Sequence, residues 1–169
     1  TGLRSDIFFQ LKEISFYLDF FLKVMLTIIT GYSAFKLSVP GLDKKNTKWV
    51  FLIPLISWFV FLIVKMGISL NSIGLSTFFP DYHIGCSINL IFFATIPVFL
   101  IVLMIKKAAP INVYLCGFLA LMSGSSIGFT AAKLVCPIET IYHIVVWHVA
   151  PFLFLSFMGF LITRLFLKW

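Results

Sequence analysis

Two of the three cysteines, Cys86 and Cys136, lie in short polar interruptions of an apolar chain, far apart in the sequence. Cys86 belongs to the segment YHIGCSINL and Cys136 to the segment KLVCPIET. A thiolate binds soft metal ions and reacts with oxidants, so two thiols can form a metal site or a dithiol that becomes a disulfide. The chain has no C-x-x-C or H-x-x-H cluster, so the two cysteines act together only if the fold brings them to one place.

Oxygen and nitrogen donors lie close to both cysteines in the sequence. Asp81 and His83 precede the first cysteine, and Glu139 follows the second. These three side chains are candidate co-ligands for a soft metal ion held by the two thiolates. His143, a few residues further along, is a secondary candidate.

The alternative interpretation is that both cysteines are passive. A free cysteine often packs as a small hydrophobic residue. Cys116, in the middle of an apolar stretch beside Gly117, is expected to do so. Spacing alone leaves both interpretations open for Cys86 and Cys136.

The composition identifies the class of protein. Hydrophobic residues make up 61% and charged residues 11% of the 169 positions, and the mean hydropathy is +1.09. Soluble domains contain about 25% charged residues. We therefore expect one membrane domain over residues 1–169, an all-α, polytopic transmembrane helical bundle. The net charge of +7 arises from basic residues between apolar stretches and requires no nucleic-acid partner.

Five apolar stretches approach the roughly 20 residues that a helix needs to cross the hydrocarbon core. They cover about residues 20–35, 49–66, 86–105, 111–134 and 141–166. Residues 1–19 carry charges among aromatic side chains, which is typical of an interfacial helix leading into a span. Asp19 and Lys23 are four residues apart and are expected to form an ion pair. In the fourth stretch, the small residues of SGSSIGFTAA favour close helix packing.

The distribution of basic residues predicts the orientation. They are densest in one set of loops and ends, which holds Lys36, Lys44, Lys45, Lys48, Lys106, Lys107, Arg164 and Lys168. Short basic loops stay in the cytoplasm. In a bacterial inner (cytoplasmic) membrane, Thr1, Cys86 and Cys136 would then face the periplasm, an oxidising compartment. Five spans that start outside predict a sixth span ahead of Thr1.

The histidines of the fifth stretch support a second hypothesis. One of His143 and His148 could ligate haem or a metal with a partner on another helix, as in a subunit of a membrane redox or transport complex. On a regular α-helix, residues five apart differ by about 140° in direction. We therefore expect these two histidines not to share a face.

Other conspicuous side chains have ordinary explanations in a membrane. Lys65 and Lys133, at span ends, are expected to reach the membrane surface. The tryptophans are expected to contribute to an interfacial belt; they are Trp49, Trp58, Trp147 and Trp169. No nucleotide-binding, nucleophile-elbow or metalloprotease motif occurs, so neither enzymatic activity nor a small-molecule substrate is expected.

The order of several motifs resembles the NrsF-type anti-sigma factors, bacterial inner-membrane regulators of extracytoplasmic-function sigma factors. The resemblance covers nearly the whole chain and rests on GLRSDI, FLKVMLT, GCSINLIFFATIPVFLIVLMIKKAAP, LVCPIETIYHIVVWHVAP and RLFLKW. Cys86 and Cys136 both match cysteines of that pattern. The chain departs from it at Val135, where histidine is common, at His148, where tyrosine is common, and at Glu139, which stands one position later.

The resemblance implies a membrane regulator with six spans and a cytoplasmic segment, ahead of Thr1, that helps to hold the sigma factor. It also implies that Cys86 and Cys136 take part in sensing at the periplasmic face, with heavy-metal or redox stress as the input. The expected partners are the sigma factor on the cytoplasmic side and the lipid bilayer. A soft metal ion at the two cysteines is the one candidate cofactor.

Overall fold

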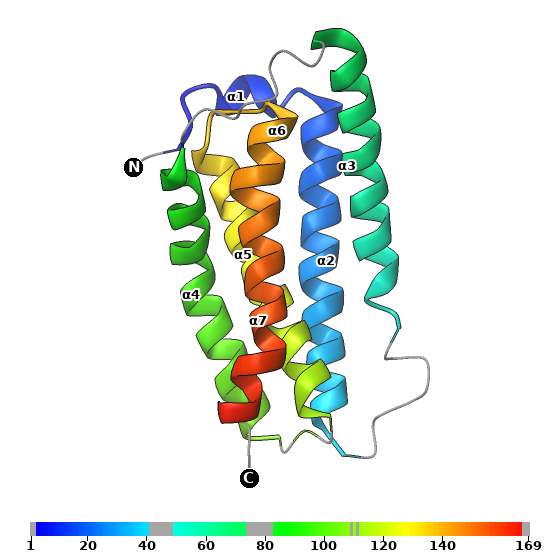
Figure 1. Cartoon of the computed structure of the whole chain (residues 1–169), viewed down its shortest axis with the longest axis vertical. Helices are drawn as coiled ribbons and strands as arrows, with labels where there is room; N and C mark the ends of the chain where they lie inside the picture. The colour runs from blue at the N-terminus through cyan, green and yellow to red at the C-terminus, as the bar shows by residue number, and fades with distance from the viewer. Residues whose placement is uncertain (1–2, 41–48, 74–82, 109, 111, 167–169) are drawn as a thin grey trace.

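The structure, a computed structural model, describes residues 3–40, 49–73, 83–108, 110 and 112–166, and helices joined by turns and short irregular segments make up this part of the chain (Figure 1). A short α1 precedes four long helices: α1 (Ile7–Gln10), α2 (Ile14–Ser38), α3 (Leu52–Ile73), α4 (Ile84–Lys106) and α5 (Val113–Val135). A last long segment joins α6 (Ile141–Ile144), the π-helical turn η2 (Val145–Val149) and α7 (Ala150–Phe166). No strand occurs in these ranges, and five segments are long and apolar enough to cross a membrane. The all-α transmembrane bundle expected from the sequence is confirmed.

The five long segments alternate in direction along one axis (Figure 1). The start of α4, the end of α5 and the start of α6 therefore lie together with α1 at one end of the bundle, which we call the cysteine end. The end of α2, the end of α4 and the start of α5 lie at the opposite end. This arrangement places Lys36 and Lys106 far from both cysteines, as the charge distribution predicts. Lys107 directly follows α4, and Arg164 belongs to the last turn of α7. The remaining members of the set, Lys44, Lys45, Lys48 and Lys168, lie outside the described residues.

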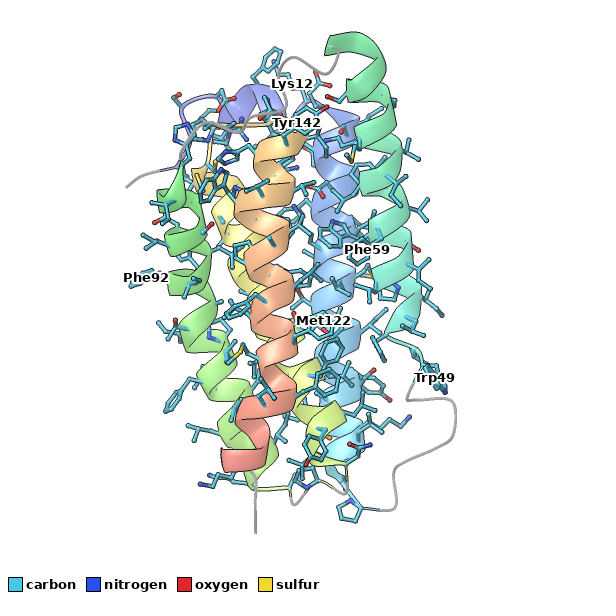
Figure 2. The ribbon with its side chains drawn as sticks, in the orientation of Figure 1. Lys12, Trp49, Phe59, Phe92, Met122 and Tyr142 are labelled. Atoms are coloured by element: carbon cyan, nitrogen blue, oxygen red, sulfur yellow. The ribbon has the colours of Figure 1, made fainter. Side chains whose placement is uncertain are left out.

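Helix α5 is the centre of the bundle. It packs against α2, α4 and α7 and is buried over most of its length. Figure 2 shows Met122 of α5 inside the bundle and Phe92 of α4 pointing away from it; Met122 is 1% and Phe92 68% exposed. Many other large apolar side chains on α3, α4 and α7 are exposed in the same way. Such a surface fits a lipid environment, where no water opposes apolar exposure.

The contact between α4 and α5 depends on two glycines spaced four residues apart. A Cβ at Gly128 would lie 2.5 Å from the carbonyl oxygen of Leu90, and a Cβ at Gly124 would lie 2.8 Å from the amide nitrogen of Val98. These distances are shorter than any ordinary contact, so the two backbones touch where the side chains are absent. The close packing that the small residues of α5 predict is confirmed.

The sequence predicts an interfacial helix over residues 1–19 and a separate span over 20–35. In the structure, the first long helix includes residues from both of these ranges. Within residues 3–19, the described part of this segment, only Ile7–Gln10 form a separate helix, and α2 starts at Ile14. The physical reason lies at Asp19, whose carboxylate is neutralised by two lysines inside the bundle. A neutralised carboxylate can lie within an otherwise apolar helix.

The interfacial position expected for Trp58 is wrong. Its side chain is fully buried between α2, α5 and α7, with its ring 5.4 Å from that of Phe129 and 5.6 Å from that of Phe152. The indole Nε1 donates a hydrogen bond of 3.3 Å to Asp19. A buried tryptophan needs a partner for this N–H. The carboxylate of Asp19, on the neighbouring helix α2, is that partner.

Replacing Gly128 with valine should destabilise the bundle, because the new side chain meets the α4 backbone. We expect a loss of about 1–3 kcal/mol of unfolding free energy, the usual cost of overpacking. Unfolding by a denaturing detergent in mixed micelles, followed by circular dichroism, measures the loss. Gly67→Val is the matched control, since nothing lies within 4 Å of a Cβ at Gly67. Equal stability of the two variants would contradict the close α4–α5 contact.

Candidate metal centre

The two cysteines of the polar interruptions meet at the cysteine end. The Sγ atoms of Cys86 and Cys136 are 3.1 Å apart, and both cysteines are free thiols. Cys86 lies in the first turn of α4, and Cys136 directly follows α5, where its amide still donates to the carbonyl of Ala132. The antiparallel packing of α4 on α5 therefore brings together two residues that the sequence separates by two helices.

Two histidines lie against the sulfur pair. The Nε2 atom of His143 is 3.3 Å from the Sγ atom of Cys136, and the ring centroids of His143 and His148 are 5.3 Å apart. One ligand atom from each of these four residues lies within 4.8 Å of the others. Both histidines are buried. The four side chains thus form a compact cluster, which we call the Cys/His cluster: Cys86, Cys136, His143 and His148.

The prediction that His143 and His148 do not share a face is wrong. It assumes a regular α-helix, whereas the chain forms a π-helical turn over Val145–Val149. A π turn closes its hydrogen bond between residues five apart, so these residues come to lie above one another. The turn therefore brings the second histidine to the same side as the first.

A proline and a serine explain why the π turn is stable. In a regular helix the carbonyl of Trp147 would accept from the N–H of residue 151, but Pro151 has no N–H. The hydroxyl of Ser87 donates to this carbonyl instead, at 2.7 Å. Ser87 follows Cys86 in α4, so the same hydrogen bond fixes the first cysteine beside the turn that carries His148.

Two further candidate ligands, His83 and Glu139, lie beside the Cys/His cluster but do not belong to it. His83 packs edge-on against His143, with 5.5 Å between ring centroids. Glu139 accepts a hydrogen bond from Nη1 of Arg4. Asp81 lies outside the described residues. Cys116 is buried in the middle of α5, as expected for a packing residue, and its Sγ faces the carbonyl of Ala34.

Arg4 joins the segment before α2 to the loop that follows Cys136. Its guanidinium bonds both carboxylate oxygens of Asp6, the carboxylate of Glu139 and the carbonyl of Pro137, and its amide donates to the carbonyl of Leu134. These bonds raise the pKa of Arg4, with Asp6 as the largest cause, and the hydrogen bonds from Arg4 lower the pKa of Asp6 to about 2. The sequence gives no sign of this role, because the partners Glu139 and Pro137 lie more than 130 residues away.

A buried ionic group lies next to the Cys/His cluster. Oδ2 of Asp19 accepts from the ammonium of Lys23, at 2.7 Å, and from that of Lys133. The predicted Asp19–Lys23 pair is confirmed. The expectation that Lys133 reaches the membrane surface is wrong: the residue is 7% exposed, because a carboxylate inside the bundle offers its charge a partner. Two cations share one anion here, so the Asp19–Lys23–Lys133 triad carries one excess positive charge.

A small cavity connects the triad to the Cys/His cluster. Its lining includes Lys23, Lys133, Cys136 and His148. Phe129 bridges the same two groups, because the Lys23 ammonium lies 3.9 Å from its ring centroid and the His148 ring stacks on it at 5.7 Å. A change of charge in the cluster therefore acts on the triad across a short, poorly screened distance.

Comparison with known proteins gives one family. The family model described as NrsF, negative regulator of sigma F, matches residues 1–169, the whole chain. No curated protein and no solved structure matches this chain.

Mild oxidation should link Cys86 to Cys136 within one chain, because their sulfur atoms already touch. Non-reducing digestion and peptide mass spectrometry should find this disulfide as the main product, while Cys116 stays reduced. The variant Cys86→Ser is the control and should give no intramolecular link. A link from Cys86 to Cys116 in place of Cys136 would contradict the observed packing.

Asp19→Asn should destabilise the protein much more than Lys133→Met. The first change leaves two buried ammonium groups without an anion, which costs on the order of 3–5 kcal/mol. The second removes only the excess charge and keeps the neutral Asp19–Lys23 pair. Detergent unfolding of both variants measures the difference, and the reverse order of stability would show that the triad is not buried as a unit.

Proposed function

The chain belongs to the NrsF family of negative regulators of sigma F, and we propose that it is an inner-membrane anti-sigma factor for an extracytoplasmic-function sigma factor. Membership makes it a negative regulator of a sigma factor, which points to a regulatory rather than an enzymatic role. In the proposal, the protein holds the sigma factor at the cytoplasmic side and releases it under heavy-metal or redox stress. Cys86 and Cys136 receive that signal at the periplasmic side.

The contact between the two thiols is the observation that carries the sensory part of the proposal. At 3.1 Å the Sγ atoms of Cys86 and Cys136 can share one metal ion after deprotonation. They can also form a disulfide, in which two protons and two electrons pass to an oxidant such as a peroxide. Both events tie the start of α4 to the residue that follows α5.

The distribution of basic residues supports an orientation in which the cysteine end faces the periplasm. The basic residues Lys36 and Lys106 lie at the end of the bundle opposite the cysteines. Basic residues beside membrane helices remain on the cytoplasmic side. In a bacterial inner membrane the cysteine end then faces the periplasm, where metal ions and oxidants from outside the cell arrive first.

The buried triad offers a route from the cysteines to the rest of the bundle. Lys133 lies three residues before Cys136 on α5 and bonds Asp19 of α2, which also accepts from Trp58 of α3. A displacement of the α5 end therefore changes how α5 meets α2 and α3, two helices that extend to the cytoplasmic end. Two alternative packings of this kind, differing by about 1–3 kcal/mol between signal states, change sigma affinity by about 5- to 150-fold.

The rival function is a haem- or metal-binding subunit of a membrane redox or transport complex, and its haem-binding form has less support. Four donor atoms within 4.8 Å of one another suit a single ion better than a porphyrin, which needs a wide flat space between axial ligands. An absorption spectrum of the purified protein distinguishes the two functions, since only the rival gives a Soret band.

Substituting Cys86 and Cys136 tests the proposal. In cells that carry a reporter for the sigma factor, Cys86→Ser and Cys136→Ser should each reduce the response to cadmium or peroxide to about that of unchallenged cells. The wild type should respond by about 5- to 150-fold, the range set by the coupling energy. Cys116→Ser is the matched control, because Cys116 lies away from the Cys/His cluster, and should respond normally. Full release on challenge in both cysteine variants would overturn the proposal.

A further inference from the structure

We propose that Cys86, Cys136, His143 and His148 together form one closed, four-coordinate site for a d10 metal ion such as Zn²⁺, Cd²⁺ or Cu⁺. The inference deepens the proposed function, on which it rests for the meaning of the signal. It makes metal binding, rather than disulfide formation alone, the chemistry of the two thiols. It also assigns His148 a role as the fourth ligand.

The spacing of the donor atoms fits such an ion. Bonds of about 2.3 Å to sulfur and 2.0–2.1 Å to nitrogen in a tetrahedron separate the ligand atoms by about 3.3–3.8 Å. The Sγ atoms of the two cysteines are 3.1 Å apart, Cys136 Sγ is 3.3 Å from His143 Nε2, and all four donors lie within 4.8 Å of one another. The sulfur pair has to open by about 0.5–0.7 Å, and the widest donor pair, at up to 4.8 Å, has to close by about 1–1.5 Å to reach this geometry.

The ring of His148 stacks on Phe129, a contact that does not require ring nitrogens. The residue is 3% exposed, and its Nδ1 atom is buried without a hydrogen-bond partner. A buried polar atom of this kind costs about 1–3 kcal/mol and requires a physical reason. His148 also lines the small cavity that Cys136 lines. Coordination of an ion by this imidazole explains why a histidine is buried here.

The two other side chains that could ligate the ion are less suitable, because one is bound to another residue and the other lies outside the group of four donors. The carboxylate of Glu139 is bound to Arg4. The ring of His83 contacts that of His143 without joining the group of four donors. The donor set is thus two thiolates and two imidazoles, which selects borderline and soft ions over Mg²⁺ or Ca²⁺.

The charge of the loaded site suits its surroundings. Two thiolates neutralise a divalent ion, and with a monovalent ion they leave one negative charge. The adjacent triad of Asp19, Lys23 and Lys133 carries one excess positive charge and shares the cavity with Cys136 and His148. The excess positive charge of the triad therefore offsets the extra negative charge of the monovalent form, and Glu139, which lines the same cavity, is paired with Arg4.

The site is closed and prearranged. Three segments supply ligands: α4 gives Cys86, the end of α5 gives Cys136, and the segment from α6 to η2 gives both histidines. The hydrogen bond from Ser87 to the carbonyl of Trp147 already fixes the first and third segments to each other. Four protein ligands leave no open coordination position, as in structural rather than catalytic metal sites. Metal binding at such a site changes packing and supports no reaction.

Cadmium binding to the purified chain in nanodiscs tests the inference. The thiolate-to-cadmium absorption band should rise to one Cd²⁺ per chain, and X-ray absorption should report two sulfur and two nitrogen ligands in the wild type. His148→Ala and the better-packed His148→Gln should each remove one nitrogen. The dissociation constant should rise at least about 10-fold, since even residues that only orient a ligand contribute about 10- to 100-fold. His83→Ala is the matched control and should leave both readouts unchanged.

Three results would overturn the inference: a wild type that binds no cadmium, a wild type with fewer than two nitrogen ligands, or His148 variants with unchanged affinity. The wild-type ligand count needs no variant, so misfolding of a variant cannot hide the answer. A failure here is distinct from failure of the proposed function. If the His148 variants bind cadmium normally while Cys86→Ser still abolishes sigma release, the four-ligand site is rejected and the cysteine sensor stands.

Discussion

The direct contact of the α4 and α5 backbones fixes the geometry on which the rest of this structure depends. Gly124 and Gly128 allow that contact, and no other residue would fit at these positions without moving α4. A shift of one helix along the other would bring a side chain against the opposite backbone. The position of the first turn of α4 relative to the last turn of α5 is therefore fixed. That register places Cys86 and Cys136 in contact, although nothing in the local sequence of either cysteine requires it.

A second constraint comes from the membrane itself, where a polar group without a partner is expensive. The cysteine end concentrates polar groups, and several of them bond to a different helix or segment. Asp19 of α2 is shared by Lys23, by Lys133 of α5 and by Trp58 of α3, and Arg4 joins the start of the chain to the loop after α5. Such shared partners make this end respond as a unit. A new charge or bond at the cysteines therefore affects three helices and not one.

Much of the fold was predictable because it depends on composition along the chain. The length of the apolar stretches predicted the five spans, and the small residues of the fourth stretch predicted the close packing of α4 on α5. The i, i+4 spacing gave the Asp19–Lys23 pair, and span counting brought Cys86 and Cys136 to one end. The rest depends on contacts between distant residues. Nothing near Lys133 indicates that its charge is balanced by Asp19, and the role of His148 depends on a π turn that regular helical periodicity cannot reveal. Pro151 was the available signal, since a proline inside a helix frees a carbonyl four residues earlier.

The central claim is that an event at the two thiols changes the affinity for a sigma factor held at the other end of the bundle. The most direct test is the dissociation constant of the full-length protein and its sigma factor, measured in nanodiscs with and without stoichiometric Cd²⁺ under reducing conditions. The account predicts that bound cadmium raises this constant by about 5- to 150-fold and that a chelator reverses the change. A dissociation constant that stays the same while cadmium is demonstrably bound to Cys86 and Cys136 would contradict it.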